Sequence, residues 1–444
     1  MIDRERKKSL DFERWVRRTS RLGKQFNPDS DRPRRGGAAQ DRYRSRVLDL
    51  YAPYIPFKQR KKAKAPRFLV PKHFSLSENT DETLAFLRGL VAYARSARTP
   101  RLLIDHRGVA KMGLGADTVL GVILKEISRE CRHKRGYSMR GLHAKDPKVR
   151  KMMEEIGCVR VMTDKGLDDM WKVTVDMKPS ANVFRYRNSS SLKVSGLTLD
   201  RKSEAATLFS DHIDSCLGAV GKALSPRGRS NLLQYFGEIV SNADEHSGSA
   251  EWVVCGYINL DDPDLIYRCT IISFGETFAS TFESLPPKSY ALKDVEEYVS
   301  AHKKGGFFSK SWREEDLIAV VALQGDISSK NVDENSTRGQ GTVDFIEFFQ
   351  SISAACVGHE VDAVMTLLTG RTKIQFDGRY QMKRNPTSGR KIIAFNGAND
   401  LALAPDSGAI RALDGDSFSG VAISIAAPLA ISVVEVSYGE EHAN

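Results

Sequence analysis

A carboxylate, an amide and an imidazole stand at positions 238, 242 and 246, a spacing of about one helical turn. In a helix of 3.6 residues per turn, Glu238, Asn242 and His246 lie on the same side, each about one turn after the last. A carboxylate one turn from an amide could polarise a water molecule while the amide oxygen binds Mg²⁺, which takes oxygen ligands and retains several waters. The same spacing is typical of a solvent-exposed helix face, and E-x-x-x-N is expected about once by chance in a chain of this length.

Two glycine-containing segments follow this predicted helix along the chain. The first, Ser273-Phe-Gly275-Glu-Thr277, ends an apolar run that predicts a strand over 265–273. The second, Arg338-Gly339-Gln-Gly341, directly precedes a helical pattern over 342–352. A glycine-rich loop that opens a helix presents backbone N–H groups and the positive end of the helix dipole to phosphate. Taken alone, either segment is equally typical of a turn.

Together these segments, in this order and at this spacing, resemble the GHKL ATPases, which share the Bergerat fold. Residues 237–248 resemble the N box, and most closely that of the anti-sigma and serine-kinase branch, which carries E-x-x-x-N-x-x-x-H. Residues 273–277 stand where the D-x-G-x-G box belongs, residues 338–341 where the second glycine box belongs, and residues 418–424 resemble the late G-T strand. The resemblance covers roughly residues 200–435.

The resemblance implies a role for each matched residue around ATP. Glu238 would activate the attacking water, and Asn242 would bind Mg²⁺. Gly275 would let the chain approach the adenine ring closely. His246 has two alternatives, a group at the nucleotide or an imidazole that satisfies a carbonyl at the end of the helix.

The phosphate groups would be held by the second glycine box. Gly339 and Gly341 would cradle them, with Arg338 nearby. Residues 276–338 would form the ATP lid, from which Lys330 or Arg338 could reach the γ-phosphate.

Three departures from the family pattern weaken the adenine site rather than the Mg²⁺ site. Ser273 replaces the aspartate that reads adenine, and a neutral hydroxyl accepts a hydrogen bond less strongly than a carboxylate. Thr277 replaces the second glycine of that box, and Val421 replaces the threonine of the late strand. Adenine specificity is therefore open, whereas the Glu238 and Asn242 pair is intact.

The segment 100–117 resembles STAS domains, the fold of anti-sigma-factor antagonists. The resemblance rests on the short apolar strand Leu103-Ile-Asp105 and on the helical pattern that begins at Ala116. The serine that is phosphorylated in such antagonists would fall near Gly113-Leu-Gly115, where this chain has none. We therefore expect a STAS-like scaffold without a phosphoacceptor at that place; an ordinary small α/β domain is the alternative.

The net charge of +11 is concentrated at the N-terminus. Residues 1–67 hold 21 Lys and Arg against 8 Asp and Glu, so their charge is +13 and that of the remaining chain is −2. We interpret residues 1–66 as an exposed basic arm. Interleaved tyrosines such as Tyr43 and Tyr51 would permit nucleic acid binding, by phosphate contacts and base stacking. A solvated tail or a docking segment for a protein partner is the alternative.

Periodicity predicts the remaining elements. We expect helices over 116–130, 149–156, 203–224 and 228–246, strands over 171–175, 252–258 and 265–273, a linker over 185–191, and a buried strand within 420–436. Six cysteines without metal-ligand spacing are expected to be core residues in a reduced compartment. No apolar run is long and continuous enough to predict a membrane span.

These observations favour an α/β chain of three parts: a basic arm (1–66), a small STAS-like α/β domain (67–185) and a C-terminal Bergerat-fold α/β sandwich (186–444). The expected activity is Mg²⁺-dependent ATP hydrolysis that gates the lid and signals to a regulatory protein partner in the cytoplasm, as a monomer or a homodimer. Two alternatives remain: an anti-sigma-like protein serine kinase, and a non-enzymatic adaptor with a degenerate nucleotide site.

Overall fold

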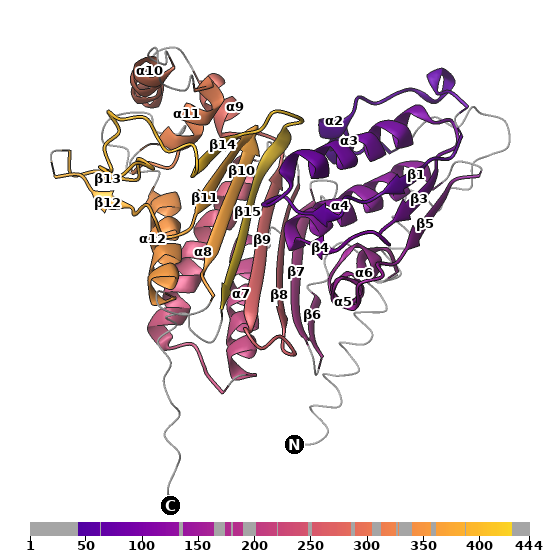
Figure 1. Ribbon diagram of the computed structural model, residues 1–444, viewed down its shortest axis with the longest axis horizontal. Helices are drawn as coiled ribbons and strands as arrows, with labels where there is room; N and C mark the ends of the chain where they lie inside the picture. Colours follow the sequence, from indigo (N-terminus) through magenta and orange to yellow (C-terminus); the bar gives the residue numbers. More distant parts are fainter. Residues whose placement is uncertain are drawn as a thin grey trace, which may run out of the picture. The chain divides into compact units, whose positions relative to one another are not determined.

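The computed structural model of the chain combines helices with β-sheets (Figure 1). It describes residues 43–62, 64–132, 136–163, 174–178, 181–189, 201–219, 221–246, 251–285, 289–303, 312–325, 327, 340–356, 361–386 and 388–428. From Ser45 onward the described residues belong to one compact unit. The chain is thus a mixed α/β protein, as predicted.

An eight-stranded sheet forms the centre of this unit, and every neighbouring pair of its strands is antiparallel. Its strand order is β14-β11-β10-β15-β9-β8-β7-β6. The bounds are β14 Ile410–Ala412, β11 Thr372–Phe376, β10 Val364–Gly370, β15 Phe418–Pro428, β9 Ile266–Phe274, β8 Glu251–Asn259, β7 Ala181–Ser189 and β6 Thr174–Lys178. The long central strands are rich in Val, Ile and Ala because both of their faces are buried.

Three helices cover one face of this sheet: α7 (Arg201–Gly218), α8 (Pro226–His246) and α12 (Gln340–Ala355) (Figure 1). Their apolar sides share one core with every second residue of β9, including Cys269 and Ile271. Three shorter helices follow β9 along the chain: α9 (Phe278–Glu283), α10 (Tyr290–His302) and α11 (Glu314–Val321). The pleat of the strands therefore decides which side chains face α8 and α12.

The opposite face of the sheet is covered by the N-terminal half of the unit. Helix α4 (Leu114–Cys131) packs on it, and the alternate residues of the strands, including Val253 and Ile272, join a second core with α4. The packing is tight at Gly115, where an added Cβ would lie only 2.9 Å from Oγ of Ser424 on β15. A side chain at this position would push the first turn of α4 away from the sheet.

The N-terminal half has its own parallel sheet of β1 (Arg67–Leu69), β3 (Arg101–Asp105) and β5 (Ser138–Leu142), in the order β1-β3-β5. The other elements of this half are α2 Arg46–Tyr51, η1 Phe57–Gln59, β2 His73–Phe74, α3 Thr80–Ser96, β4 Lys111–Met112, α5 Pro147–Glu155 and α6 Cys158–Thr163. Two small hairpin strands, β12 (Lys383–Arg384) and β13 (Lys391–Ile392), lie late in the chain. This is an α/β unit of the predicted kind; whether it is STAS-like remains a prediction.

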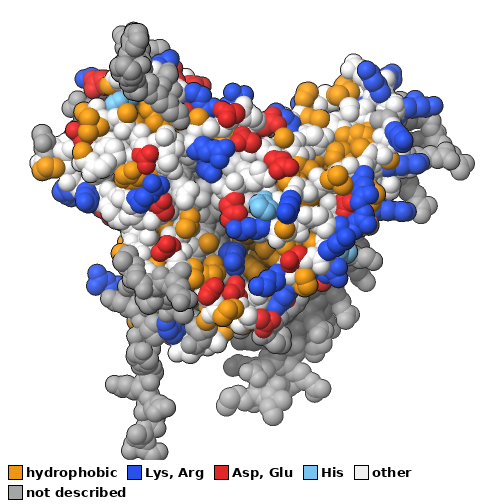
Figure 2. Space-filling model, viewed as in Figure 1, with side chains coloured by type: hydrophobic (Ala, Val, Ile, Leu, Met, Phe, Trp, Pro, Cys, Tyr) orange, Lys and Arg blue, Asp and Glu red, His pale blue; other side chains and the backbone are white. Residues whose placement is uncertain are grey.

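The exposed row across this parallel sheet is basic. Arg67 and Arg140 stand on either side of Leu103 in register, and Arg101 lies two residues away on β3. All three arginines are exposed, and Figure 2 shows Lys and Arg side chains gathered over this end of the molecule. Basic surface is therefore present on the folded body as well as in the N-terminal segment.

Most of the elements predicted from periodicity are confirmed. The helices predicted from positions 116, 149, 203, 228 and 342 correspond to α4, α5, α7, α8 and α12, and the strands predicted from positions 252 and 265 correspond to β8 and β9. The buried strand predicted late in the chain is β15 as far as Pro428; residues 429–436 lie outside the described part. All six cysteines are free and buried, as expected of core residues.

Three predictions are wrong in part. The expected linker over 185–191 is instead the second half of β7 as far as Ser189, which pairs with β8. The expected exposed arm includes α2, whose Val47, Leu48 and Tyr51 are buried. The expected lid over 276–338 includes α11, whose Leu317 and Val320 are fully buried in the core. In each case polar residues around the segment obscured a buried apolar stripe.

No helix in the described part of the chain is long and apolar enough to cross a membrane.

Candidate functional site

Helix α8 presents the predicted carboxylate and amide on the side away from its core. Ser225 precedes the helix and accepts a hydrogen bond from the backbone N–H of Gly228 (3.0 Å), which satisfies one of the free donors at the helix start. Pro226 follows in the first helical position, where its missing N–H costs nothing. Glu238 is exposed and Asn242 is half-buried. The apolar side of α8 is buried as predicted, through Leu232, Phe236, Ile239, Val240 and Ala243.

The C-terminal half of α8 is fixed to the sheet by Asp244, a residue that the sequence analysis did not single out. Its Oδ1 accepts hydrogen bonds from Nε1 of Trp252 on β8 and from Nδ2 of Asn188 on β7, both at 2.8 Å. A charged acceptor strengthens both bonds. Because Asp244 lies two residues after Asn242, this anchor fixes where the Asn242 amide lies. Only the pairing of β7 with β8 reveals the anchor.

The segment that resembles the second glycine box contacts helix α8 at one described residue. Gly341 is the second residue of α12, and a methyl group placed on it would overlap Cγ of Glu238. The backbone at the start of α12 therefore lies directly against the Glu238 side chain. The other predicted phosphate-binding residues, Lys330, Arg338 and Gly339, lie outside the described residues, as does the side chain of His246.

Ser273 lies on the helix-covered side of the sheet. It alternates with Cys269 and Ile271, which face α8, and it pairs across the strands with Val421 on β15 and Trp252 on β8. Two of the three residues that depart from the family pattern, Ser273 and Val421, are thus direct neighbours. Ser273 is only 4% exposed among the described residues, so an adenine ring would have to enter a nearly closed space.

Gly275 and Thr277 line a pocket that is separate from Glu238. Gly275 has φ of 137° and donates its N–H to the carbonyl of Ser419 (3.1 Å). The Thr277 hydroxyl accepts a hydrogen bond from the N–H of Ser280 (3.1 Å) and caps α9. Both residues line a pocket of about 410 Å³ that Glu238 does not line. Capping α9 is a sufficient structural reason for a threonine at position 277.

The described residues contain no group of three or more His, Cys, Asp and Glu side chains that could hold a metal ion. The Mg²⁺ ligand expected here is one amide, Asn242, and such an ion would take its other ligands from phosphate and water. The donor set therefore fits Mg²⁺ bound together with a nucleotide and does not fit a metal site made by protein side chains alone.

Gly113 lies at one end of the segment where a STAS phosphoacceptor would fall, and the hydroxyl nearest to it belongs to Ser75. A Cβ on Gly113 would lie 3.1 Å from Oγ of Ser75. That hydroxyl is buried and accepts hydrogen bonds from the N–H groups of Ser77 and Glu78, both at 3.2 Å. Ser75 therefore holds a turn, and its position gives no reason to expect a phosphoacceptor.

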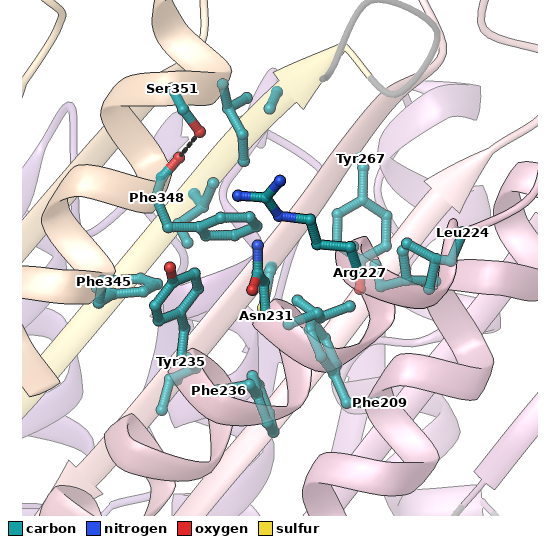
Figure 3. A pocket seen from close by; sticks show the side chains of 18 residues that line it. Phe209, Leu224, Arg227, Asn231, Tyr235, Phe236, Tyr267, Phe345, Phe348 and Ser351 are labelled. Atoms are coloured by element: carbon teal, nitrogen blue, oxygen red, sulfur yellow. Dashed lines mark hydrogen bonds between the residues drawn. The ribbon is translucent and has the colours of Figure 1, made fainter. Parts of the chain in front are cut away.

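A second hollow lies farther along α8 toward its N-terminus, between α7, α8, α12 and the sheet (Figure 3). Arg227 and Asn231 are among the residues that line it, whereas Glu238, Asn242 and Ser273 are not. It is thus separate from the residues that the sequence analysis assigned to a nucleotide.

No family model matches this chain, and neither the curated proteins nor the solved structures contain a match to it. The class of protein is therefore defined by the molecule itself: a mixed α/β protein whose eight-stranded antiparallel sheet has helices α7, α8 and α12 on one face and a small parallel α/β unit on the other.

Proposed function

We propose that the chain is an Mg²⁺-dependent ATP-binding regulatory protein of the GHKL type that hydrolyses ATP and signals to a partner. The contact between Gly341 and Glu238 is the observation that carries this proposal. It joins two segments that are about a hundred residues apart and that each resemble a box of the family. The first N–H groups of α12, a helix of 16 residues, would face phosphate beside a carboxylate.

In this proposal Glu238 is the general base and Asn242 binds Mg²⁺. Gly341, together with Gly339 and Arg338, surrounds the phosphates. Ser273 accepts a hydrogen bond from the adenine amino group. Because β9 carries Ser273 on one face and contacts α4 with the other, a change at the nucleotide could pass through the sheet to the N-terminal unit.

A non-enzymatic adaptor is the alternative that specific observations favour. The buried Ser273 pairs across the strands with the half-buried Val421, and Thr277 is engaged as a cap. In that case Glu238 would serve only to stabilise the positive end of α12, an effect of about 0.3–1 kcal/mol at an exposed site. A protein serine kinase with the same ATP contacts is a further alternative, which no described residue favours over hydrolysis.

The test is a calorimetric titration with ATP, with and without Mg²⁺, followed by a phosphate-release assay. Binding that requires Mg²⁺ and is followed by phosphate release supports the ATPase. Binding without release supports the adaptor, and transfer of phosphate to a partner protein supports the kinase.

The positive charge of the N-terminal segment is complementary to nucleic acid or to an acidic protein partner. Residues 1–42 hold 13 Lys and Arg against 7 Asp and Glu, a charge of +6, and lie outside the described residues, so this part of the proposal rests on composition alone.

Asn242→Ala is expected to abolish the Mg²⁺-dependent part of ATP binding, because it removes the only protein ligand proposed for the ion. Calorimetric titration with and without Mg²⁺ measures this directly. Gln234→Ala is the matched control: it removes an exposed amide from the same helix, two turns earlier, and should leave the affinity unchanged. Unchanged affinity in Asn242→Ala would refute the Mg²⁺ assignment.

Ser273→Asp is expected to tighten ATP binding by about 1–2 kcal/mol, because a charged acceptor replaces a neutral one on the strand face that points toward α8. Ser273→Ala should weaken binding, since it removes the acceptor. Because position 273 is buried, the thermal midpoint of both variants must be recorded without ligand. A stable Ser273→Asp protein with equal or lower affinity would show that the residue is not the adenine reader.

A further inference from the structure

The hollow at the N-terminal end of α8 is a cavity of about 320 Å³ (Figure 3). Its walls are mainly aromatic and aliphatic. Phe209 comes from α7, Tyr235 and Phe236 from α8, Tyr267 from β9, and Phe345 and Phe348 from α12. Cavities of this size, lined by apolar rings with a few polar groups, are typical of small-molecule sites.

Polar groups lie on one side of this cavity. Arg227 is exposed and Asn231 is half-buried, both on the first turns of α8, and Figure 3 shows the two side chains directed toward the space between α8 and α12. Within the described part of the chain Arg227 makes no ion pair, and no Asp or Glu lines the cavity. A guanidinium beside an apolar cavity without a carboxylate is complementary to an anion.

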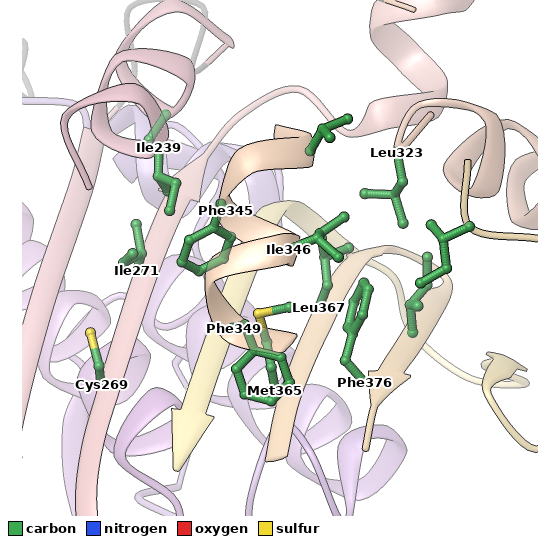
Figure 4. Packing of buried hydrophobic residues seen from close by; sticks show 14 of the residues in the cluster. Ile239, Cys269, Ile271, Leu323, Phe345, Ile346, Phe349, Met365, Leu367 and Phe376 are labelled. Carbon is green, nitrogen blue, oxygen red and sulfur yellow. The ribbon is translucent and has the colours of Figure 1, made fainter. Parts of the chain in front are cut away.

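The cavity is preformed, because the opposite side of α12 is tightly packed. Ile346 and Phe349 are buried against the strands of the sheet, next to Met365 and Leu367 of β10 (Figure 4). Helix α12 therefore cannot move toward the sheet to fill the cavity without displacing this layer. A preformed cavity lowers the cost of ordering a ligand.

We propose that this cavity binds a small aromatic monoanion, an aryl carboxylate or sulfonate. The ring system would lie among Phe209, Tyr235 and Phe348, where aromatic side chains favour edge and offset contacts. The acidic group would lie at the mouth and accept hydrogen bonds from Arg227 and Asn231. The volume suits one or two fused rings. This site does not depend on the proposed ATPase function, because none of its residues takes part in it.

The experiment is a fluorescence titration of the full chain with anilinonaphthalene sulfonate, which combines aromatic rings with one anionic group. We expect saturable binding at one site and displacement by naphthoate. Arg227→Gln should raise the dissociation constant about tenfold, as expected for loss of one charge-assisted contact. Ile425→Trp, which fills the cavity from β15, should abolish the site.

Arg384→Gln is the matched control, because it removes an exposed arginine from β12, outside the cavity. If it weakens binding as much as Arg227→Gln, the effect is one of net charge and the proposal fails. Displacement by neutral naphthyl methanol as effective as that by naphthoate would overturn the anion assignment. Binding that is seen only after removal of residues 429–444 would show that the end of the chain itself fills the cavity, which would also overturn the proposal. If Ile425→Trp does not fold, Arg227→Gln and the displacement series still test whether the cavity binds an aromatic anion.

Discussion

Glu238→Gln is expected to stop ATP turnover while ATP remains bound. The carboxylate is exposed on α8, it lies against the start of α12, and it is about one turn from the proposed Mg²⁺ ligand Asn242. A glutamine keeps the size of the side chain but cannot take a proton from water. Loss of a general base costs about 10²- to 10⁴-fold in rate. The rate of phosphate release at saturating ATP, together with the dissociation constant for ATP, measures the two parts of this prediction.

The matched control is Glu154→Gln, which removes an exposed carboxylate from α5, outside the expected lid and the candidate site, and should leave both quantities unchanged. The unfolding free energy of Glu238→Gln separates catalysis from structure. If Glu238 only supports the start of α12, the variant loses stability of about 0.3–1 kcal/mol and the wild-type protein releases no phosphate. Wild-type turnover in Glu238→Gln would mean that the base is another residue and that the N-box mechanism does not apply.

Gly420→Ala is expected to destabilise the fold by about 2–5 kcal/mol. Gly420 has φ of 135°, a conformation that side-chain-bearing residues rarely adopt, and a methyl group there would overlap the carbonyl oxygen of Ser273 on the neighbouring strand. Backbone strain and overpacking each cost about 1–3 kcal/mol. The register between β10 and β15 also shifts beside this residue. Moving the strands apart there to make room for the methyl group would therefore cost strand pairing. Denaturant unfolding of the two proteins measures the difference.

Gly237→Ala on α8 provides the comparison. The nearest atom to an added methyl group would be Cβ of Ala206, at 3.9 Å, and a glycine inside a helix costs about 1 kcal/mol relative to alanine. That variant should therefore be as stable as the wild type or more so. Equal stability of Gly420→Ala and wild type would show that β15 accommodates a side chain there, and that the closeness of Ser273 and Val421 is not maintained by the glycine.

The sequence alone predicted the elements that carry a strong apolar period. The stripe Leu232, Phe236, Ile239, Val240 and Ala243 identified α8, and it left Glu238 and Asn242 on the other side. Periodicity succeeds here because burial of one helix face dominates the free energy of packing. It failed at β7, where Arg185 and Arg187 made a strand resemble a linker. Arg187 lies between the carboxylates of Glu126 and Glu251, contacts that no local pattern contains.

What only the tertiary structure decided is which of the candidate residues meet. Gly341 reaches Glu238 because α12 packs beside α8 on one face of the sheet, whereas Gly275 and Thr277 line another pocket. The anchor from Asp244 to Trp252 and Asn188 depends on the pairing of β7 with β8, and the aromatic cavity is lined by five elements, α7, α8, β9, α12 and β15. Residue types and spacing determine what a side chain can do; the long-range pairing of strands and helices determines its neighbours, because those contacts form only when distant segments are buried together.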